Sequence, residues 1–184
     1  MKNKFILASK SPRRKELLSQ IIKDFIICPA NIDEEAFPLN EVSLQKGKCI
    51  SNIYPKSWIL SADTYVLFNN EVFGKPKDKE DAYRILKILS NQTHQVTTYF
   101  TLINNEKDII YTSSVTSHVT FNDLSDELIN CYIDSLSPLD KAGAYGIQDN
   151  EKYHFIKKYE GSLDNIIGLP LKEVKEAMIK LKII

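Results

Sequence analysis

Basic residues gather in one short stretch near the start of the chain. They are Lys10, Arg13, Arg14 and Lys15. Ser11 is a favourable N-cap and Pro12 suits the first helical position, so a helix is expected to begin here. Cations are unfavourable at that end of a helix, whereas an anion held by free N–H groups, hydroxyls and guanidinium groups would be favourable. The stretch 9–15, with the Ser9 hydroxyl, therefore predicts a phosphate site.

Two other interpretations of this stretch are open on the local pattern. Basic residues at a helix start often lie in solvent, at a cost of about a few tenths of a kcal/mol. A Ser-Pro-basic-basic sequence can also lie along a DNA groove. However, the chain has 24 basic and 24 acidic residues, and non-specific nucleic-acid binding needs many phosphate contacts. A small phosphorylated ligand is therefore expected rather than a nucleic acid.

Asp63 is the strongest catalytic candidate. It follows the apolar segment 58–62, which predicts a strand that delivers Asp63 and Thr64 to the carboxyl edge of a sheet. Ligands of α/β proteins bind at such edges. The carboxylate could take a proton from water or bind a divalent cation, although an aspartate after a strand can also simply form a turn.

Other charged residues could complete such a site. Asp33 and Glu34 belong to a dense acidic segment that could join Asp63 around a metal ion or lie in solvent. Lys48 and Lys75 could each contact phosphate, although isolated lysines are usually just exposed.

The segments that would position these residues alternate between strand and helix patterns. Strands are expected at 4–8, 25–28, 58–62, 96–103, 109–121 and 155–159, with a hairpin of 65–68 and 71–73 around Asn69-Asn70. Helices are expected at 12–22, 40–53, 78–89, 126–135 and 171–181. Together they predict one α/β domain over residues 1–184, built on a mixed sheet.

The remaining composition narrows the class of protein. No apolar run has the length of a membrane span, and the N-terminal apolar run is too short for a signal peptide. Three widely spaced cysteines fit neither a disulfide framework nor a zinc site. The histidines form no ligand pair, and His118 lies within an alternating strand pattern that indicates a structural role. A cytoplasmic, membrane-independent protein is expected.

Five ordered motifs resemble those of Maf proteins, a family of nucleoside triphosphate pyrophosphatases. They are Leu7-Ala8-Ser9-x-Ser11-Pro12-Arg13-Arg14-x-Glu16-Leu17-Leu18, Ala62-Asp63-Thr64, Gly74-Lys75-Pro76, the stretch 89–98 and the stretch 140–148. The resemblance covers nearly the whole chain. It implies a single elongated α/β domain around a mixed, twisted sheet with a deep cleft, and a homodimer as a common oligomeric state.

The resemblance also implies a reaction. Family members hydrolyse a nucleoside triphosphate between the α and β phosphates, giving the monophosphate and pyrophosphate with a divalent cation, Mg²⁺ or Mn²⁺. Asp63 matches the proton acceptor that activates water, and Glu34, with Asp33, matches acidic positions near the metal beside Asp63. The positions that match triphosphate contacts are Ser9, Arg13, Arg14, Lys48 and Lys75.

Substrate choice follows from one branch of the family. The run 140–148 resembles members that act on dTTP and UTP, and Arg13, Thr64 and Gln148 match positions linked to that selectivity. The Gln148 amide offers a donor and an acceptor to the O4 and N3–H edge of thymine or uracil. Asp149 departs from the usual Gly and therefore bears on the shape of the base pocket.

A nucleotide-binding regulator is the alternative class of function. The family has been linked to the regulation of cell division and septum formation, so the chain could bind nucleotides with weak or secondary hydrolysis. Retention of Asp63, Lys75 and the Ser-Pro-Arg-Arg stretch favours the enzyme.

Overall fold

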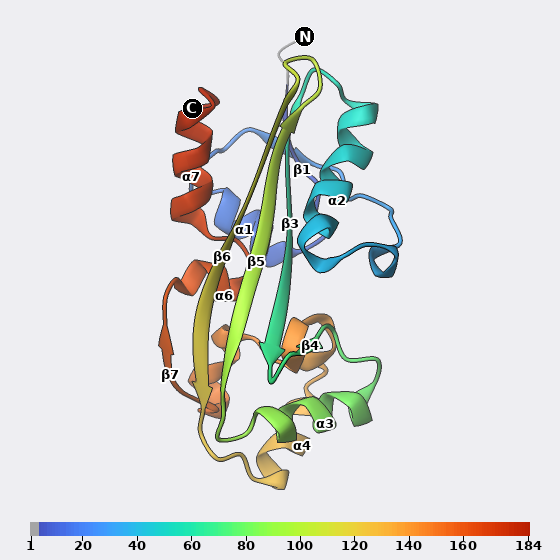
Figure 1. Ribbon diagram of the computed structural model, residues 1–184. Coiled ribbons are helices and arrows are strands. Elements are labelled where there is room, and N and C mark those ends of the chain that lie inside the picture. The colour runs from blue at the N-terminus through green and yellow to red at the C-terminus, as the bar shows by residue number, and fades with distance from the viewer. Residues whose placement is uncertain (1–3) are drawn as a thin grey trace. The chain divides into compact units, whose positions relative to one another are not determined.

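The described residues form two compact units. The computed structural model describes residues 4–184. Unit 1 contains the described residues up to Asp63, together with Thr98–Val115 and Gly168–Ile184. Unit 2 contains Thr64–Thr97 and Thr116–Ile167. The chain passes between the units within three strands, β3 (Trp58–Phe68), β5 (Thr93–Asn104) and β6 (Ile109–Phe121), and once more between Ile167 and Gly168 (Figure 1).

The described strands form a mixed sheet, as predicted. Its seven strands are ordered β2-β1-β3-β5-β6-β7, with β4 paired to β3. The remaining bounds are β1 (Phe5–Leu7), β2 (Phe25–Ile27), β4 (Glu71–Phe73) and β7 (Ile156–Glu160). β1 runs parallel to β2 and β3, whereas β4 and β7 run antiparallel to β3 and β6. All of β1 is buried, which is typical of a parallel strand covered on both faces.

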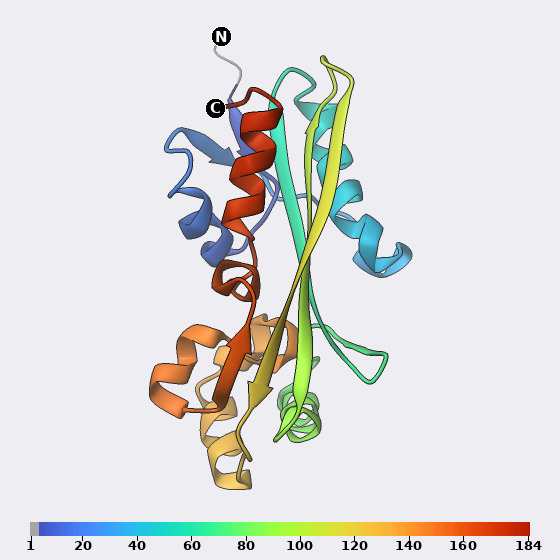
Figure 2. The same cartoon turned by 60° about the vertical axis from the view of Figure 1, so that its left-hand side comes forward.

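Helices cover both faces of the sheet in unit 1. α2 (Leu39–Ile53) lies on one face, and α1 (Pro12–Leu18) and α7 (Leu171–Lys180) lie on the other (Figures 1 and 2). Ile50 of α2 packs in one apolar cluster with Ile59 and Ile103 of the sheet. A Cβ added at Gly47 would lie 2.9 Å from Ser61 Oγ, so this glycine lets α2 approach β3 closely.

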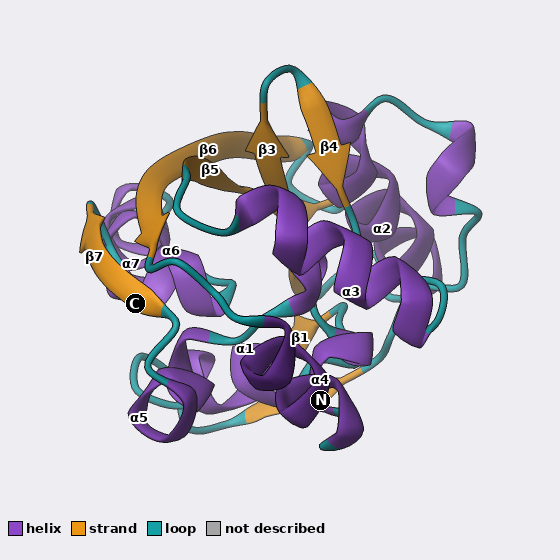
Figure 3. Ribbon diagram, turned by 90° about the horizontal axis from the view of Figure 1, so that it is seen from below, coloured by secondary structure: helices purple, strands orange, loops and turns teal. Residues whose placement is uncertain are grey.

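Unit 2 has an apolar core of its own. Its helices are α3 (Lys79–Leu89), α4 (Asp126–Asp134), α5 (Asn150–Tyr153) and α6 (Leu163–Ile167). Leu86 of α3, Tyr132 of α4 and the aromatic rings of Phe121 and Phe155 belong to the same buried cluster. Figure 3 shows β7 alongside the end of β6, where the two strands pair.

Several boundaries differ from the predictions. The expected strand 58–62 and the first arm of the hairpin are one strand, β3, because Tyr65 and Val66 continue its buried pattern. Asp63 therefore lies within a strand and not at its end. α1 stops at Leu18, four residues early, because Gln20 and Ile21 donate to the carbonyls three residues before them, those of Leu17 and Leu18, in tighter turns.

Other predictions are confirmed. Asn69 and Asn70 both have positive φ, 50° and 63°, as the two-residue turn of a hairpin requires. Asp78 caps α3, with its side chain accepting from the N–H of Asp81 at 2.8 Å. The short helices α5 and α6 were not predicted, because four or five residues carry too little periodicity to be recognised. No helix within residues 4–184 is long and apolar enough to cross a membrane.

His94 on β5 is buried in the core of unit 2. We therefore expect the stability of the fold to fall at acidic pH. Its Nε2 lies 2.8 Å from the Tyr145 hydroxyl, and no described residue is bonded to its Nδ1. Burial lowers the pKa of His94 from 6.5 to about 3. Between pH 6.5 and pH 3, His94 therefore binds a proton in the unfolded chain but not in the folded one. The free energy of unfolding is therefore unaffected by His94 above pH 6.5 and falls progressively as the pH falls from 6.5 towards 3.

We expect the free energy of unfolding to fall by about 2 kcal/mol between pH 7 and pH 5, because each pH unit below 6.5 lowers it by about 1.4 kcal/mol. Urea unfolding at the two pH values measures the loss. Many carboxylates also titrate below pH 5, so the informative quantity is the difference from His94→Gln, which cannot be protonated in this range. Equal pH dependence in the wild-type protein and the variant would contradict the prediction.

Candidate active site

The turn between β1 and α1 carries the first part of the site. Ser11 is the N-cap, accepting from the N–H of Arg14 at 3.4 Å, and Pro12 is the first helical residue, as predicted. Ser9 is buried, and its Oγ accepts from the N–H of Ser11 at 3.2 Å. The two hydroxyls thus fix the backbone of the turn, which holds the helix start and its N–H groups in place.

Arg14 joins this turn to a distant part of unit 1. Its Nε donates to the Gly168 carbonyl at 2.8 Å, and its Nη1 lies 3.4 Å from Ser9 Oγ. These bonds use two of the five N–H donors of a guanidinium. Arg13 is half-buried, whereas Lys10 and Lys15 are exposed. Only part of the predicted basic cluster is therefore held in place by the fold.

Asp63 belongs to an ion-pair cluster in unit 1 that is centred on Lys46. The Lys46 ammonium is 2.6 Å from Asp63 Oδ1 and 2.9 Å from Glu34 Oε1. The side chains of Lys46 and Asp63 are 10% and 11% exposed, whereas that of Glu34 is 54% exposed. One cation thus bridges a buried carboxylate from β3 and an accessible one from the short 3-10 helix Glu34–Ala36. We call these three residues the Lys46 cluster.

Lys46 is the member of this cluster that sequence reasoning missed. It lies on the buried face of α2, in line with Val42, Ser43 and Ile50 at helical spacing. A lysine within an apolar stripe is rarely buried unless it is paired, and this signal could have singled it out. Lys48, the lysine that was predicted instead, is two residues further along α2 and exposed.

The Lys46 cluster bears on the predicted metal ion. Glu34 and Asp63 contact one ammonium, so both carboxylates lie within reach of one cation. Asp33 caps the 3-10 helix, its Oδ1 accepting from the N–H of Glu35 at 3.2 Å. No group of three or more His, Cys, Asp or Glu side chains within 4–184 could hold a metal ion by itself. Mg²⁺ usually takes one or two carboxylates plus substrate phosphates, and this pair fits that pattern.

Three other predicted site residues belong to unit 2. Thr64 is half-buried on β3, whereas Lys75 and Gln148 are exposed. The N–H of Gly143 donates to the Gly74 carbonyl at 3.0 Å, which ties the segment 137–149 to the residue before Lys75. Gly143 has φ 69°, and a Cβ there would lie 2.6 Å from a methyl group of Val66. The glycine therefore permits the close approach that brings these two motifs together.

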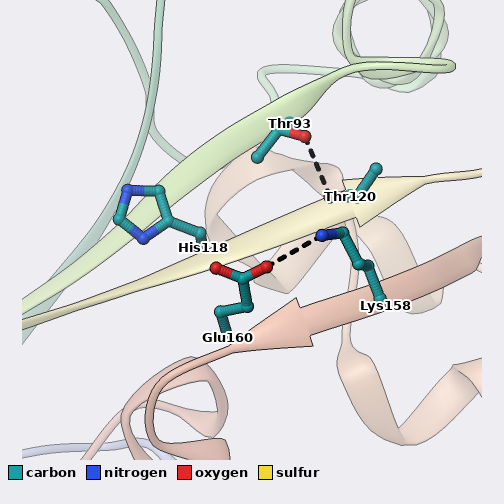
Figure 4. Close-up of a pocket in the computed structure, with 5 residues that line it drawn as sticks. All are labelled: Thr93, His118, Thr120, Lys158 and Glu160. Atoms are coloured by element: carbon teal, nitrogen blue, oxygen red, sulfur yellow. Dashed lines mark hydrogen bonds and ion pairs between the residues drawn. The ribbon is translucent and has the colours of Figure 1, made fainter.

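A shallow pocket of about 160 Å³ lies on the strands of unit 2. Figure 4 shows its lining residues, which are Thr93, His118, Thr120, Lys158 and Glu160. The threonine hydroxyls bond each other at 2.9 Å, and Lys158 pairs with Glu160 at 2.8 Å. None of the predicted site residues lines this pocket. His118 faces it from β6, within the strand pattern from which it was predicted to be structural.

The fold and the Lys46 cluster define the chain as a mixed-sheet α/β protein with a charged, carboxylate-containing site. The family model described as Maf-like protein matches residues 4–181, and the chain belongs to this family.

Similar proteins agree with this assignment. A dTTP/UTP pyrophosphatase of Latilactobacillus sakei is 42% identical over 92% of this chain and 96% of its own. Another of the same name from Thermosipho africanus is 45% identical over 93% of this chain and 90% of its own. A third, from a Geobacter species, is 41% identical over 97% and 96%. The chain thus spans nearly the full length of these relatives.

Proposed function

We propose that this protein hydrolyses nucleoside triphosphates, dTTP and UTP above all, between the α and β phosphates. The products would be the nucleoside monophosphate and pyrophosphate. The observation that carries the proposal is the Lys46 cluster, in which a buried carboxylate of β3 lies 2.6 Å from an ammonium. The Ser9–Arg14 turn belongs to the same unit and follows β1, which pairs with β3. The names of the relatives supply the nucleotides and the class of reaction.

In this proposal the residues of unit 1 divide the work between charge and proton transfer. Arg13, Arg14 and Ser9 bind phosphate oxygens at the start of α1, where anions are favoured. Lys46 offsets charge that develops as water attacks. Asp63 uses one oxygen for Lys46 and takes the proton of the attacking water on the other, as a general base. Lys48 and Lys75 stay predicted phosphate contacts.

A divalent cation, Mg²⁺ or Mn²⁺, completes the proposal. Glu34 and Asp63 would hold it with the phosphates of the substrate, and Asp33 would support this segment of chain. When bound, such an ion polarises phosphoryl oxygens and offsets their negative charge. The two carboxylates and the substrate would then share the coordination that a larger all-protein cluster provides elsewhere.

The decisive experiment follows the two products separately. Purified protein with Mg²⁺ or Mn²⁺ is incubated with each nucleoside triphosphate, and pyrophosphate and orthophosphate are measured. We expect pyrophosphate with the monophosphate, fastest for dTTP and UTP. Orthophosphate with a diphosphate would refute cleavage between α and β. Nucleotide binding without turnover would instead favour the regulatory role in cell division or septum formation.

Gln148 is proposed to read the base, and its replacement gives a separate prediction. In Gln148→Ala the amide that would pair with the O4 and N3–H edge is lost. We expect the preference for dTTP and UTP over purine nucleotides to fall by about tenfold, the usual scale for a hydrogen bond worth 1–2 kcal/mol. Ratios of kcat/KM measure this preference. An unchanged ratio would mean that the base is read by other residues.

Three wider expectations remain predictions. They are a single domain over residues 1–184, a homodimer, and action in the cytoplasm on free nucleotides. Gel filtration with light scattering would test the oligomeric state directly.

A further inference from the structure

Asp149 is held by an inward-facing polar network in unit 2. Its Oδ2 accepts from the Tyr132 hydroxyl at 2.6 Å and from the Ser137 hydroxyl at 2.8 Å. The Lys141 ammonium lies 3.9 Å from the same oxygen and donates to Ser137 Oγ at 2.8 Å. The Tyr132 hydroxyl also accepts from the N–H of Gly146 at 3.1 Å. One carboxylate oxygen thus ties both ends of the segment 137–149 to helix α4.

The donors of this network are fixed in state and position. Tyr132 is 2% exposed, and burial together with the bond to Asp149 raises its pKa well above the usual value, so its hydroxyl stays protonated and donates. Lys141 packs directly over Gly146. A Cβ on that glycine would lie 2.7 Å from Lys141 Cε and 3.2 Å from Asp149 Oδ2. The backbone beside Gln148 is therefore in contact with the network itself.

The same segment adopts a conformation that needs such support. Leu136 and Ala144 have φ of 60° and 59°, a region that side chains other than glycine rarely occupy. Residues of this kind persist where surrounding contacts determine the backbone. The network supplies such contacts, because Ser137 and Lys141 lie between Leu136 and Ala144 in the sequence and both belong to it.

Gln148 and Asp149 are neighbours in the 3-10 helix Ile147–Asp149. Successive side chains of a 3-10 helix point about 120° apart. Because Asp149 is held inward by Tyr132 and Ser137, Gln148 must point elsewhere, and it is exposed.

We propose that Asp149 is a positioning residue, which through Tyr132 and Ser137 fixes the direction of the Gln148 amide and so sets nucleobase selectivity. This inference rests on the proposed function. Asp149 acts through the segment that it holds, because its Oδ2 is engaged by the hydroxyls of Tyr132 and Ser137. Its effect is on the geometry of the neighbouring amide.

The test compares variants of the full-length protein by kcat/KM for dTTP and UTP against dATP and GTP. Asp149→Ala removes the acceptor, and Tyr132→Phe removes one donor and leaves the carboxylate. We expect both to lower the pyrimidine preference by about tenfold, because small misplacements of substrate contacts have effects of this size or larger. Asp149→Asn keeps an acceptor oxygen and should recover part of the preference. Glu151→Ala, which removes an exposed carboxylate two residues away, is the matched control.

The possible outcomes of this test separate the inference from its alternatives. Selectivity lost in Asp149→Ala and Tyr132→Phe, partly recovered in Asp149→Asn and intact in Glu151→Ala would support it. A folded, active Asp149→Asn and Asp149→Ala pair with wild-type selectivity would overturn it while leaving the proposed function standing. A wild-type protein that releases no pyrophosphate from any nucleotide would overturn the proposed function and this inference together. If Asp149→Ala does not fold, Tyr132→Phe and Asp149→Asn decide the question alone.

Discussion

Asp63→Asn should lower kcat for dTTP hydrolysis by about 10²–10⁴, the usual effect of removing a general base. The substitution keeps the shape of the side chain on β3 and removes its ability to take a proton. The amide oxygen can still accept from Lys46, and Glu34 still pairs with that ammonium. Nucleotide binding should therefore change much less than turnover. Steady-state kinetics, together with direct binding of a non-hydrolysable triphosphate analogue, measure the two effects separately.

Glu34→Gln is the matched variant for this experiment. Glu34 contacts the same ammonium but is 54% exposed, and it belongs to a different element. If it only helps to hold the metal, its replacement should raise the metal concentration needed for half-maximal activity. Unchanged turnover in Asp63→Asn with a large loss in Glu34→Gln would assign the base to Glu34 instead.

Lys46→Met should destabilise the protein by about 3–5 kcal/mol, because it leaves the Asp63 carboxylate buried without its ammonium. The two side chains are 10% and 11% exposed, so water can replace the lost partner only in part. Urea unfolding at neutral pH measures the change. Lys48→Met is the control for stability: it removes a lysine from the same helix, but an exposed one, and should shift the free energy of unfolding by less than about 0.5 kcal/mol.

A double variant makes this prediction specific to the ion pair. In Lys46→Met with Asp63→Asn, no buried carboxylate remains at position 63, so the double variant should be more stable than Lys46→Met alone. Equal stability of the two would mean that the cost of Lys46→Met comes from lost packing around α2 and not from an unpaired charge. Activity should be low in both variants, because Lys46 and Asp63 both act in the proposed reaction.

The pattern of strands and helices was predictable because it depends on local sequence. Most boundaries of the strands and longer helices lie within a few residues of the predicted ones, since apolar periodicity and capping residues such as Asp78 act over one or two turns. The exceptions are β3 and α1. β3 continues past Asp63 because burial of Tyr65 and Val66 extends the strand, and a polar residue in mid-strand hides this continuity in the sequence.

The site was predictable in part. Asp63, Glu34 and the Ser9–Arg14 turn were proposed from residue types and motif resemblance, and the structure brings Asp63 and Glu34 onto one cation. Lys46 was missed because two lysines, Lys46 and Lys48, lie so close in sequence. The apolar stripe of α2 sets the rotation of the helix about its axis, and this rotation turns Lys46 and not Lys48 towards β3.

The sequence by itself determined the class of fold, the family and the chemical types available to the site, because these depend on local patterns and on motifs that keep their order along the chain. The tertiary structure alone decided which charges meet. Lys46 reaches Asp63 across 17 residues of chain, and Asp149 is bound by Tyr132 of another helix, because side-chain packing between elements selects these partners. Contacts between distant segments have no local signature, and they are where the proposed base and the proposed control of selectivity are set.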